Sequence, residues 1–300
     1  KEILDASKCR YGFMTTTSLK DKVAIITGST RGYGYAIAQA MLKAGAVVVV
    51  SGRSQDALTK AMASLEALGT VKGQTCDVRN EEQVYALARF AVQSFGRIDI
   101  WVNNAGYSSS AGLMLETNPQ EAIDMFLAND MGTLYGCQAA LHFMTKRGEG
   151  TLINIYGNGS FLRPASPTGL YGATKAWVAS FTRSLAKEIS GSGIKLIGYS
   201  PGMLLTDMLT NPVVIGERGK EMLKRYSFVL RLLANDPQKA AQKLVDAVAD
   251  NEKEFIEYRM LRPWTILFSM LRVWWEDLTK TGHTPEYTLR YENPYRPKID

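Results

Sequence analysis

The sequence has few of the residues that bind metals or cross-link small folds. Its 300 residues include three cysteines and two histidines. The cysteines, Cys9, Cys76 and Cys137, are too few for a disulfide-linked scaffold and form no metal-ligand cluster with the histidines. We therefore expect no metal site and no zinc-dependent chemistry.

Long runs of one kind of residue are also missing. No stretch has the roughly 18 to 20 uninterrupted apolar residues that a membrane-spanning helix needs, and the best one, residues 263–271, ends at Arg272. Lys and Arg are scattered, without a basic run or zinc-finger spacing, so nucleic acid is not an expected partner despite a net charge of +6. The phosphate of a nucleotide or of a membrane fits this charge better.

The first residues leave two hypotheses about the cellular compartment of the protein. Residues 1–13 lack the long apolar core of a secretory signal. Met14, followed by three threonines, is typical of a natural start, so residues 1–13 are either added sequence or the remainder of a cleaved leader. We expect a cytoplasmic protein, or a plastid protein if a leader has been removed, and membrane association is a further hypothesis.

The chain does contain a regular alternation of short β-branched runs and longer helical stretches. The runs cover residues 23–27, 46–51, 98–103, 151–155 and 194–199. Continuous apolar runs joined by helices are typical of buried parallel strands with right-handed crossovers. The pattern predicts an α/β fold, a single Rossmann-type domain with a doubly wound parallel sheet.

This domain is expected to fill most of the chain. The predicted parts are an N-terminal arm (1–18), the Rossmann-type domain (19–260) and an aromatic-rich C-terminal extension (261–300). Towards the end of the domain, residues 206–226 are expected to form a lid or irregular helix. Residues 237–249 are expected to form a helix, and residues 255–261 a last strand.

A glycine-rich segment joins the first predicted strand to a helix expected over residues 35–44. It consists of Gly28, Ser29, Thr30, Arg31, Gly32, Tyr33 and Gly34. Glycine allows positive φ angles and a close approach of the backbone to a pyrophosphate, and the helix N-terminus offers free N–H groups. Between the first strand and first helix of a βαβ series, the segment predicts a dinucleotide-binding loop, the alternative being an ordinary glycine turn.

The end of the second predicted strand indicates which dinucleotide binds. It reads Ser51-Gly52-Arg53-Ser54, without the acidic residue that binds the ribose hydroxyls of NAD. A 2′-phosphate pairs well with guanidinium groups. Arg53, together with Arg31, therefore indicates NADP(H), the alternative being that both arginines are solvated surface groups.

A tyrosine and a lysine lie four residues apart at the start of a predicted helix. Tyr171 and Lys175 therefore share one helical face. A neighbouring ammonium group and an oxidised nicotinamide both favour phenolate and lower the pKa of tyrosine from its usual value near 10. Tyr171 could then give a proton to a carbonyl oxygen as hydride reaches the carbon, although the spacing alone also occurs by chance.

Four motifs in this order resemble the short-chain dehydrogenase/reductase family over residues 19–206. They are Thr27-Gly28-x-x-x-Gly32-x-Gly34, Asn103-Asn104-Ala105-Gly106, Tyr171-x-x-x-Lys175 and Ser200-Pro201-Gly202. The resemblance implies that Tyr171 is the acid/base, that Lys175 binds the nicotinamide ribose and that Asn129 holds a water in a proton relay. The other cofactor-binding residues that it implies are Asp77, Val78, Asn104, Ala105, Gly106, Pro201, Gly202 and Thr206.

The chain departs from this family at one position. Most members have a serine about thirteen residues before the tyrosine, which orients the substrate carbonyl, and here that position is Asn158. The nearest serine, Ser160, lies eleven residues before Tyr171. Either Ser160 takes this role from a different loop conformation, which we favour, or the amide of Asn158 replaces the hydroxyl.

Several short strings resemble the chlorophyll b reductase branch of the family. They are Asn154-Ile-Tyr-Gly-Asn-Gly-Ser160, Arg163-Pro164, Asp99-Ile-Trp-Val-Asn-Asn-Ala-Gly106 and Ser200-Pro-Gly-Met203. This resemblance implies reduction by NADPH of a formyl group on a large, apolar tetrapyrrole. The alternatives are a fatty-acyl, steroid-like or polyketide ketone as substrate, or a non-catalytic nucleotide-binding scaffold.

The C-terminal extension and two long helical stretches suggest partners. Residues 260–275 combine apolar and aromatic side chains with Arg262 and Arg272. Aromatic stripes at helical spacing usually pack in a core or an oligomer contact, which we favour, and a helix on a membrane interface or a wall of an apolar substrate pocket is the alternative. By resemblance to the family, residues 119–146 and 168–190 are expected to pair in a homodimer or homotetramer.

Overall fold

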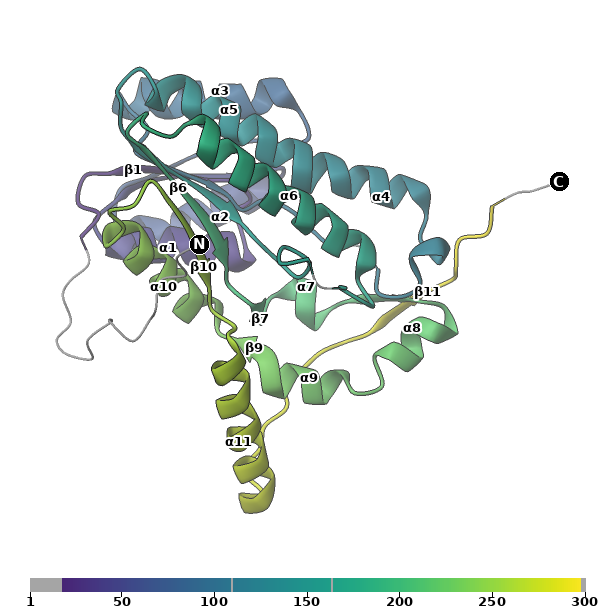
Figure 1. Cartoon of the computed structure of the whole chain (residues 1–300). Helices are drawn as coiled ribbons and strands as arrows, with labels where there is room; N and C mark the ends of the chain where they lie inside the picture. The colour runs from purple at the N-terminus through teal and green to yellow at the C-terminus, as the bar shows by residue number, and fades with distance from the viewer. Residues whose placement is uncertain (1–17, 109, 163, 298–300) are drawn as a thin grey trace.

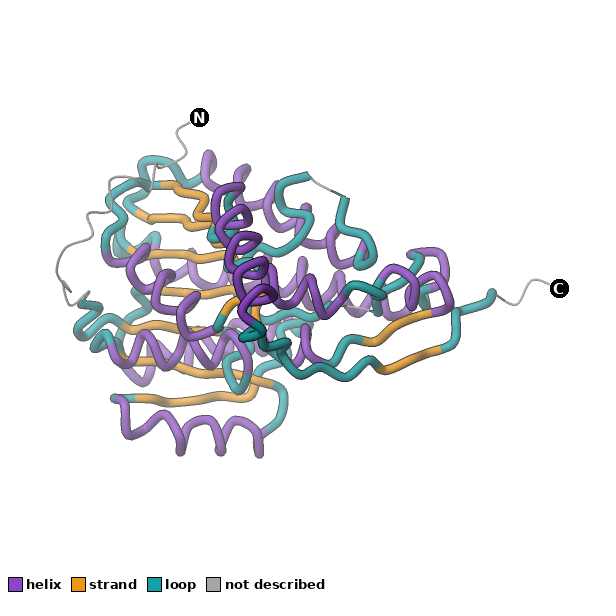
Figure 2. Tube along the Cα trace, turned by 90° about the horizontal axis from the view of Figure 1, so that it is seen from below, coloured by secondary structure: helices purple, strands orange, loops and turns teal. Residues whose placement is uncertain are grey.

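Seven strands form one parallel sheet in the computed structural model, which describes residues 18–108, 110–162 and 164–297 (Figures 1 and 2). The strands are β1 (Val23–Ile26), β2 (Val47–Gly52), β3 (Val71–Thr75), β4 (Ile100–Asn103), β5 (Gly150–Ile155), β6 (Ile194–Ser200) and β10 (Phe255–Arg259). The predicted N-terminal arm, Ser18 apart, and Arg163 lie outside the described residues. The Rossmann-type parallel sheet predicted from the sequence is confirmed.

The strand order reverses between β1 and β4, and we call the region beyond the carboxyl ends of these two strands the crevice. The order is β10-β6-β5-β4-β1-β2-β3, so the chain builds outward from β1 in one direction and then crosses over to β4. Ile25 of β1 lies opposite Val49 of β2 on one side and Trp101 of β4 on the other. In open parallel sheets, ligands bind beyond the carboxyl ends of the strands where the order reverses, here between β1 and β4.

Helices cover both faces of the sheet (Figure 1). The helices are α1 (Gly32–Lys43), α2 (Gln55–Leu65), α3 (Glu81–Phe95), α4 (Pro119–Phe126), α5 (Gly132–Met144), α6 (Gly169–Glu188), α7 (Asp207–Thr210), α8 (Gly216–Met222), α9 (Tyr226–Leu233), α10 (Pro237–Ala249) and α11 (Pro263–Thr279). Ala24 and Ile26 pack with α1, α2 and α10, whereas Ile25 between them packs with α3, α5 and α6. Because both faces of β1 are buried, its sequence is a continuous apolar run rather than an alternating one.

Local signals fix where several helices begin and end. Asn80 caps α3 by accepting a hydrogen bond from the Gln83 N–H at 3.1 Å, and Asp236 does the same for Gln238 of α10 at 2.8 Å. Gly96 ends α3 with a φ angle of +78°, which a residue with a side chain rarely adopts. Short 3₁₀ turns occur at Glu66–Leu68 and Met114–Glu116, and a π-helical turn, η4, covers Leu127–Met131.

The chain after β6 is less regular, as predicted. It contains four short strands, β7 (Met203–Leu204), β8 (Val213–Ile215), β9 (Ala234–Asn235) and β11 (Arg290–Glu292). Strand β11 pairs with β8, and β7 pairs with β9. Helix α11 projects away from the sheet in Figure 1. None of the helices in the described ranges is both long and apolar enough to cross a membrane.

Candidate active site

The glycine-rich loop lies at the crevice between β1 and β4. Gly28 has a φ angle of +63°, and a Cβ there would come within 2.9 Å of the Cα of Ala105. A Cβ at Gly34 would collide with the carbonyl oxygen of Gly28 and the side-chain amide of Asn104. Glycine is therefore required at both positions, because the loop, the start of α1 and the end of β4 are in direct contact.

Hydrogen bonds from the end of β4 hold this loop in place. The Thr27 hydroxyl accepts hydrogen bonds from the backbone N–H groups of Asn104 and Ala105, both at 3.0 Å. The Asn104 amide donates to the carbonyl oxygens of Thr27 and Gly28 at 2.9 and 3.1 Å. Asn104 and Ala105 therefore brace the loop through Thr27, which is the first residue of the family motif but was not predicted as a site residue.

Helix α1 begins at Gly32, three residues earlier than predicted, so the last part of the loop is its first turn. Arg31 occupies the N-cap position, and within the described residues its side chain makes no capping hydrogen bond. An uncapped first turn offers N–H groups and positive partial charge to an anion. The structure thus places an uncapped helix start directly after the glycine-rich loop.

The side chains of Ser29 and Tyr33 serve the fold. The fully buried Ser29 hydroxyl donates to the Ile26 carbonyl oxygen at 2.7 Å and accepts from the Ser51 N–H at 2.9 Å. The Tyr33 hydroxyl donates to the Ala240 carbonyl oxygen on α10 at 3.3 Å. Ser29 therefore joins the glycine-rich loop to β2, and Tyr33 joins it to α10.

Positive charge lies at the β2 end of the crevice. Arg53 follows β2 directly and is exposed, next to Gly52, where a Cβ would lie 2.6 Å from the Thr30 side chain. The pKa of Asp77 is lowered, mainly by its hydrogen bonds from Arg79 and in part by the charge of Arg53. Arg53, Thr30 and Asp77 are therefore brought to one end of the crevice. Arg31 is also exposed and pairs with Asp207 at 3.5 Å.

Val78 and three predicted residues of the loop after β6 lie around the same crevice. Val78 is buried against Gly132, where a Cβ would lie 2.9 Å from its side chain. Thr206 lies beside the start of α1, 3.7 Å from a Cβ built at Gly32. Gly202 has a φ angle of +79°, and Pro201 before it is buried at the end of β6. Thr206 therefore brings the segment after β6 next to the glycine-rich loop.

Asn129 is completely buried in the π-helical turn η4. Its amide donates to the Tyr107 carbonyl oxygen and to the Thr174 hydroxyl, both at 3.0 Å, and its carbonyl oxygen accepts from the Tyr107 N–H at 3.0 Å. A Cβ at Gly106 would lie 2.6 Å from that oxygen. Asn129 therefore joins the end of β4 to α6, and π-helical turns of this kind often occur at functional sites.

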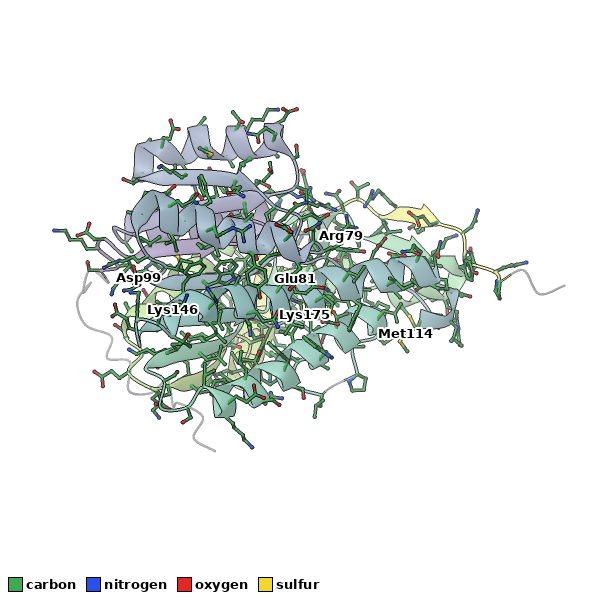
Figure 3. All side chains as sticks on the ribbon, turned by 90° about the horizontal axis from the view of Figure 1, so that it is seen from above. Arg79, Glu81, Asp99, Met114, Lys146 and Lys175 are labelled. Carbon is green, nitrogen blue, oxygen red and sulfur yellow. The ribbon has the colours of Figure 1, made fainter. Side chains whose placement is uncertain are left out.

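Tyr171 and Lys175 project together from the first turns of α6. The Lys175 ammonium lies 5.8 Å from the centre of the Tyr171 ring and donates to the Ile155 carbonyl oxygen at the end of β5, at 3.0 Å. Figure 3 shows Lys175 near the middle of the molecule. The pair therefore sits beside the end of β5, close to Gly106 and to the α6 residue Thr174 that Asn129 contacts.

Burial sets the charges of this pair. It lowers the pKa of Lys175 to about 8 and raises that of Tyr171 to about 12. The direction for Tyr171 is opposite to the lowering expected from a neighbouring ammonium group, because loss of hydration disfavours the phenolate more strongly. The protein alone therefore holds Tyr171 as a neutral phenol, the form that can donate a proton.

An acid next to Asn129 was not predicted. Asp130 is 1% exposed, and its Oδ1 has no hydrogen-bond partner among the described residues. Burial raises its pKa to about 7, and the positive charge of Lys175 opposes that rise. The available signal in the sequence was a single charged residue in the stretch 127–132.

In the loop after β5, the two candidates for orienting the substrate differ in exposure: Ser160 is buried and Asn158 is not. The Ser160 hydroxyl is buried, donates to the Lys175 carbonyl oxygen at 2.9 Å and accepts from the Gly157 N–H at 3.1 Å. Asn158 is exposed. The residue against the Tyr171 hydroxyl is Gly157, where any Cβ would collide with that hydroxyl. Sequence spacing did not identify Gly157, because a glycine offers no reactive group to look for.

Comparisons with known proteins agree with this geometry. A family model described as short chain dehydrogenase matches residues 22–213. An uncharacterised oxidoreductase of Staphylococcus aureus is 40% identical over 190 residues, which cover 63% of this chain and 81% of that protein. Chlorophyll(ide) b reductase NOL, chloroplastic, of Arabidopsis thaliana is 35% identical over 228 residues, which cover 74% of this chain and 63% of that protein.

A solved structure with the same fold is that of 3-ketoacyl-(acyl-carrier-protein) reductase from Brucella melitensis, complexed with NADH. It has a TM-score of 0.70 and 25% identity, and the match covers 81% of this chain and 97% of that chain. The branch resemblance to chlorophyll b reductases noted in the sequence is thus also found over most of the chain.

Proposed function

Because the chain belongs to the short-chain dehydrogenase family, we propose that it interconverts a carbonyl compound and an alcohol with NADP(H). The observation that carries this proposal is the meeting of two elements at one crevice. The glycine loop between β1 and α1 can hold a pyrophosphate, and Tyr171 and Lys175 stand at the end of β5. These residues fit a dinucleotide, since the loop admits no Cβ at Gly28 or Gly34 and presents an uncapped helix start.

Each residue of the site has a defined task in this reaction. When bound, the nicotinamide supplies or accepts the hydride. Tyr171, neutral through burial, donates a proton to the carbonyl oxygen during reduction. Lys175, held by the Ile155 carbonyl oxygen, provides the positive charge that stabilises the phenolate left behind. Asn129 fixes the position of α6 through Thr174.

The preference for NADP(H) rests on Arg53. It is exposed directly after β2, at a position where a 2′-phosphate would meet guanidinium rather than carboxylate. A hydrogen bond between charged groups contributes about 1.5–3 kcal/mol, so Arg53→Ala should raise the KM for NADPH by roughly 10- to 150-fold. The KM for NADH should hardly change. Arg89→Ala, at an exposed arginine on α3, is the matched control and should leave both constants unchanged. Equal constants for the two dinucleotides in the wild type would refute the preference.

For the substrate we propose a formyl group on a large apolar ring system, such as chlorophyllide b. The proposal is supported by the likeness to the plant chlorophyll(ide) b reductase. A β-keto thioester is the second candidate, favoured by the likeness to the bacterial 3-ketoacyl reductase.

NADPH consumption with both substrates tests the activity. We expect oxidation of NADPH with chlorophyllide b, and loss of at least a thousandfold in Tyr171→Phe with unchanged NADPH binding. If only the keto thioester is turned over, the proposed substrate is wrong and the proposed reaction stands. Binding of NADPH without turnover of any carbonyl compound would indicate a non-catalytic nucleotide-binding scaffold instead.

A further inference from the structure

Helix α11 presents its polar side to the protein. Arg231 of α9 pairs with Glu276 at 3.3 Å and with Asp277 at 2.7 Å. Arg272 donates to the Arg231 carbonyl oxygen at 2.6 Å. A cavity of about 160 Å³ lies between α9 and α11, and Thr265 forms part of its lining. The contact between this helix and the rest of the protein therefore includes several ion pairs and hydrogen bonds.

The opposite side of α11 is apolar and exposed. Its side chains, each between 50% and 66% exposed, are Trp264, Leu267, Phe268, Met270, Leu271, Trp274, Trp275 and Leu278. We call this set the α11 outer face. At 100° per residue these positions cover a continuous arc of about 160°, and none of them is charged. A surface helix normally turns its apolar side inward, so α11 has the reverse arrangement.

The size of this face requires a partner. Eight side chains that are each at least half exposed present on the order of 800 Å² of apolar surface. Soluble monomers rarely expose contiguous apolar patches of more than a few hundred Å², and larger ones mark sites of interaction. Val273 is the α11 residue that is buried against the protein, so packing within the chain does not use the outer face.

We propose that the α11 outer face inserts into the headgroup region of an anionic lipid bilayer, with the helix lying in the plane of the membrane. The helix has 17 residues and is about 25 Å long, which suits a helix that lies on a membrane. Three of the eight exposed side chains are tryptophans, the side chain most suited to the boundary between apolar chains and water.

Two observations favour a lipid surface over a second copy of the chain. Two paired helices cover a narrow seam, whereas a bilayer can cover the full arc of about 160°. The charge is also complementary, because the protein has a net charge of +6 and Arg262 lies over the Trp264 ring at 5.1 Å. The acids near the end of the helix, Glu276 and Asp277, pair with Arg231, and Glu276 also pairs with Arg272 at 3.4 Å, so two arginines balance the two acids.

The proposed binding would bring the membrane close to the active site. Helix α11 follows β10, and Leu261 between them contacts Gly202, where a Cβ would lie 2.8 Å from its side chain. Gly202 belongs to the segment after β6 that also contains Thr206, which lies beside the glycine-rich loop. An apolar carbonyl compound dissolved in the bilayer could therefore reach the crevice, which is a consequence that rests on the proposed function, whereas the binding does not.

Vesicle flotation tests the proposal. The full chain is mixed with vesicles of pure phosphatidylcholine or of phosphatidylcholine with 30 mol% phosphatidylglycerol. We expect the wild type to float with the anionic vesicles, and the double variant Trp274→Ser/Trp275→Ser to bind them at least tenfold more weakly. Both side chains are about 60% exposed, so the variant should fold and bind NADPH normally. The double variant Leu115→Ser/Leu162→Ser, at exposed leucines outside α11, is the matched control and should float like the wild type.

Other results would overturn the proposal. A wild type that stays in the soluble fraction with both kinds of vesicle excludes a lipid surface. Light scattering then distinguishes the alternative, because a second copy on this face would give a mass that halves in Trp274→Ser/Trp275→Ser. Equal binding to neutral and anionic vesicles would contradict the role assigned to charge. None of these results depends on catalytic activity, so failure here is distinct from failure of the proposed reaction.

Discussion

Replacing Lys175 by methionine should abolish turnover and, at neutral pH, make the folded protein more stable. Burial lowers the pKa of Lys175 from 10.5 to about 8. At about 1.4 kcal/mol per pH unit, keeping this side chain charged in the folded state costs about 3 kcal/mol at pH 7. Methionine fills a similar volume without charge, but it gives up the hydrogen bond to the Ile155 carbonyl oxygen, which contributes about 1 kcal/mol.

The neighbouring acid, Asp130, has little effect on this difference in the free energy of unfolding. The pKa of Asp130 is already raised to about 7, so without the positive charge of Lys175 it takes up a proton at small cost near neutral pH. The expected net gain of Lys175→Met is therefore about 2 kcal/mol at pH 7.

The stability gained by Lys175→Met must also depend on pH in a defined direction. Because the pKa of Lys175 is lower in the folded than in the unfolded state, the unfolded chain binds more protons between about pH 8 and 10.5. The free energy of unfolding of the wild type therefore rises through this window, and the advantage of the variant should shrink by about 2 kcal/mol between pH 7 and pH 10.

Urea unfolding of both proteins at pH 7 and pH 10, without added dinucleotide, measures this difference. Lys187→Met, at an exposed lysine near the end of the same helix, is the matched control and should change stability by less than about 0.5 kcal/mol at either pH. A stability difference between Lys175→Met and the wild type that is the same at both pH values would refute the argument from burial.

Further predictions concern the same site. Asp130→Asn removes the negative charge near Lys175, so the pKa of Lys175 should fall below about 8. The alkaline limb of the rate of carbonyl reduction should then move to lower pH by roughly one unit, which a pH profile of kcat measures. Gly34→Ala should abolish dinucleotide binding in a calorimetric titration, because its Cβ has no room beside the phosphate loop; unchanged affinity would contradict the assigned geometry. Gly157→Ala should lower kcat at least tenfold with a smaller effect on NADPH binding, because its Cβ would displace the Tyr171 hydroxyl, and steady-state kinetics with binding titrations separate the two effects.

The sequence predicted those parts of the fold that local chemistry determines. The strands of the sheet centre are continuous apolar runs because helices cover both of their faces, and helix 237–249 was predicted with its observed bounds. Strand β3 (Val71–Thr75) was not predicted. It lies at the edge of the sheet, has only one neighbouring strand and mixes lysine, glycine and glutamine with apolar residues.

The site was predicted where its residues are close in sequence or form known motifs. The loop 27–34 and the pair Tyr171–Lys175 lie on one turn or one helix, so their spacing carries the information. Asp130 and Gly157 were missed because their importance arises from contacts across the fold. The buried carboxylate lies near an ammonium from α6, and the glycine lies against a hydroxyl fourteen residues further along the chain.

Calorimetric titration of the full chain with NADPH and NADH tests the central claim most directly, because every step assigned to Tyr171 and Lys175 requires a dinucleotide at the glycine loop. We expect NADPH to bind at a single site, more tightly than NADH. Absence of binding for both dinucleotides would contradict the account.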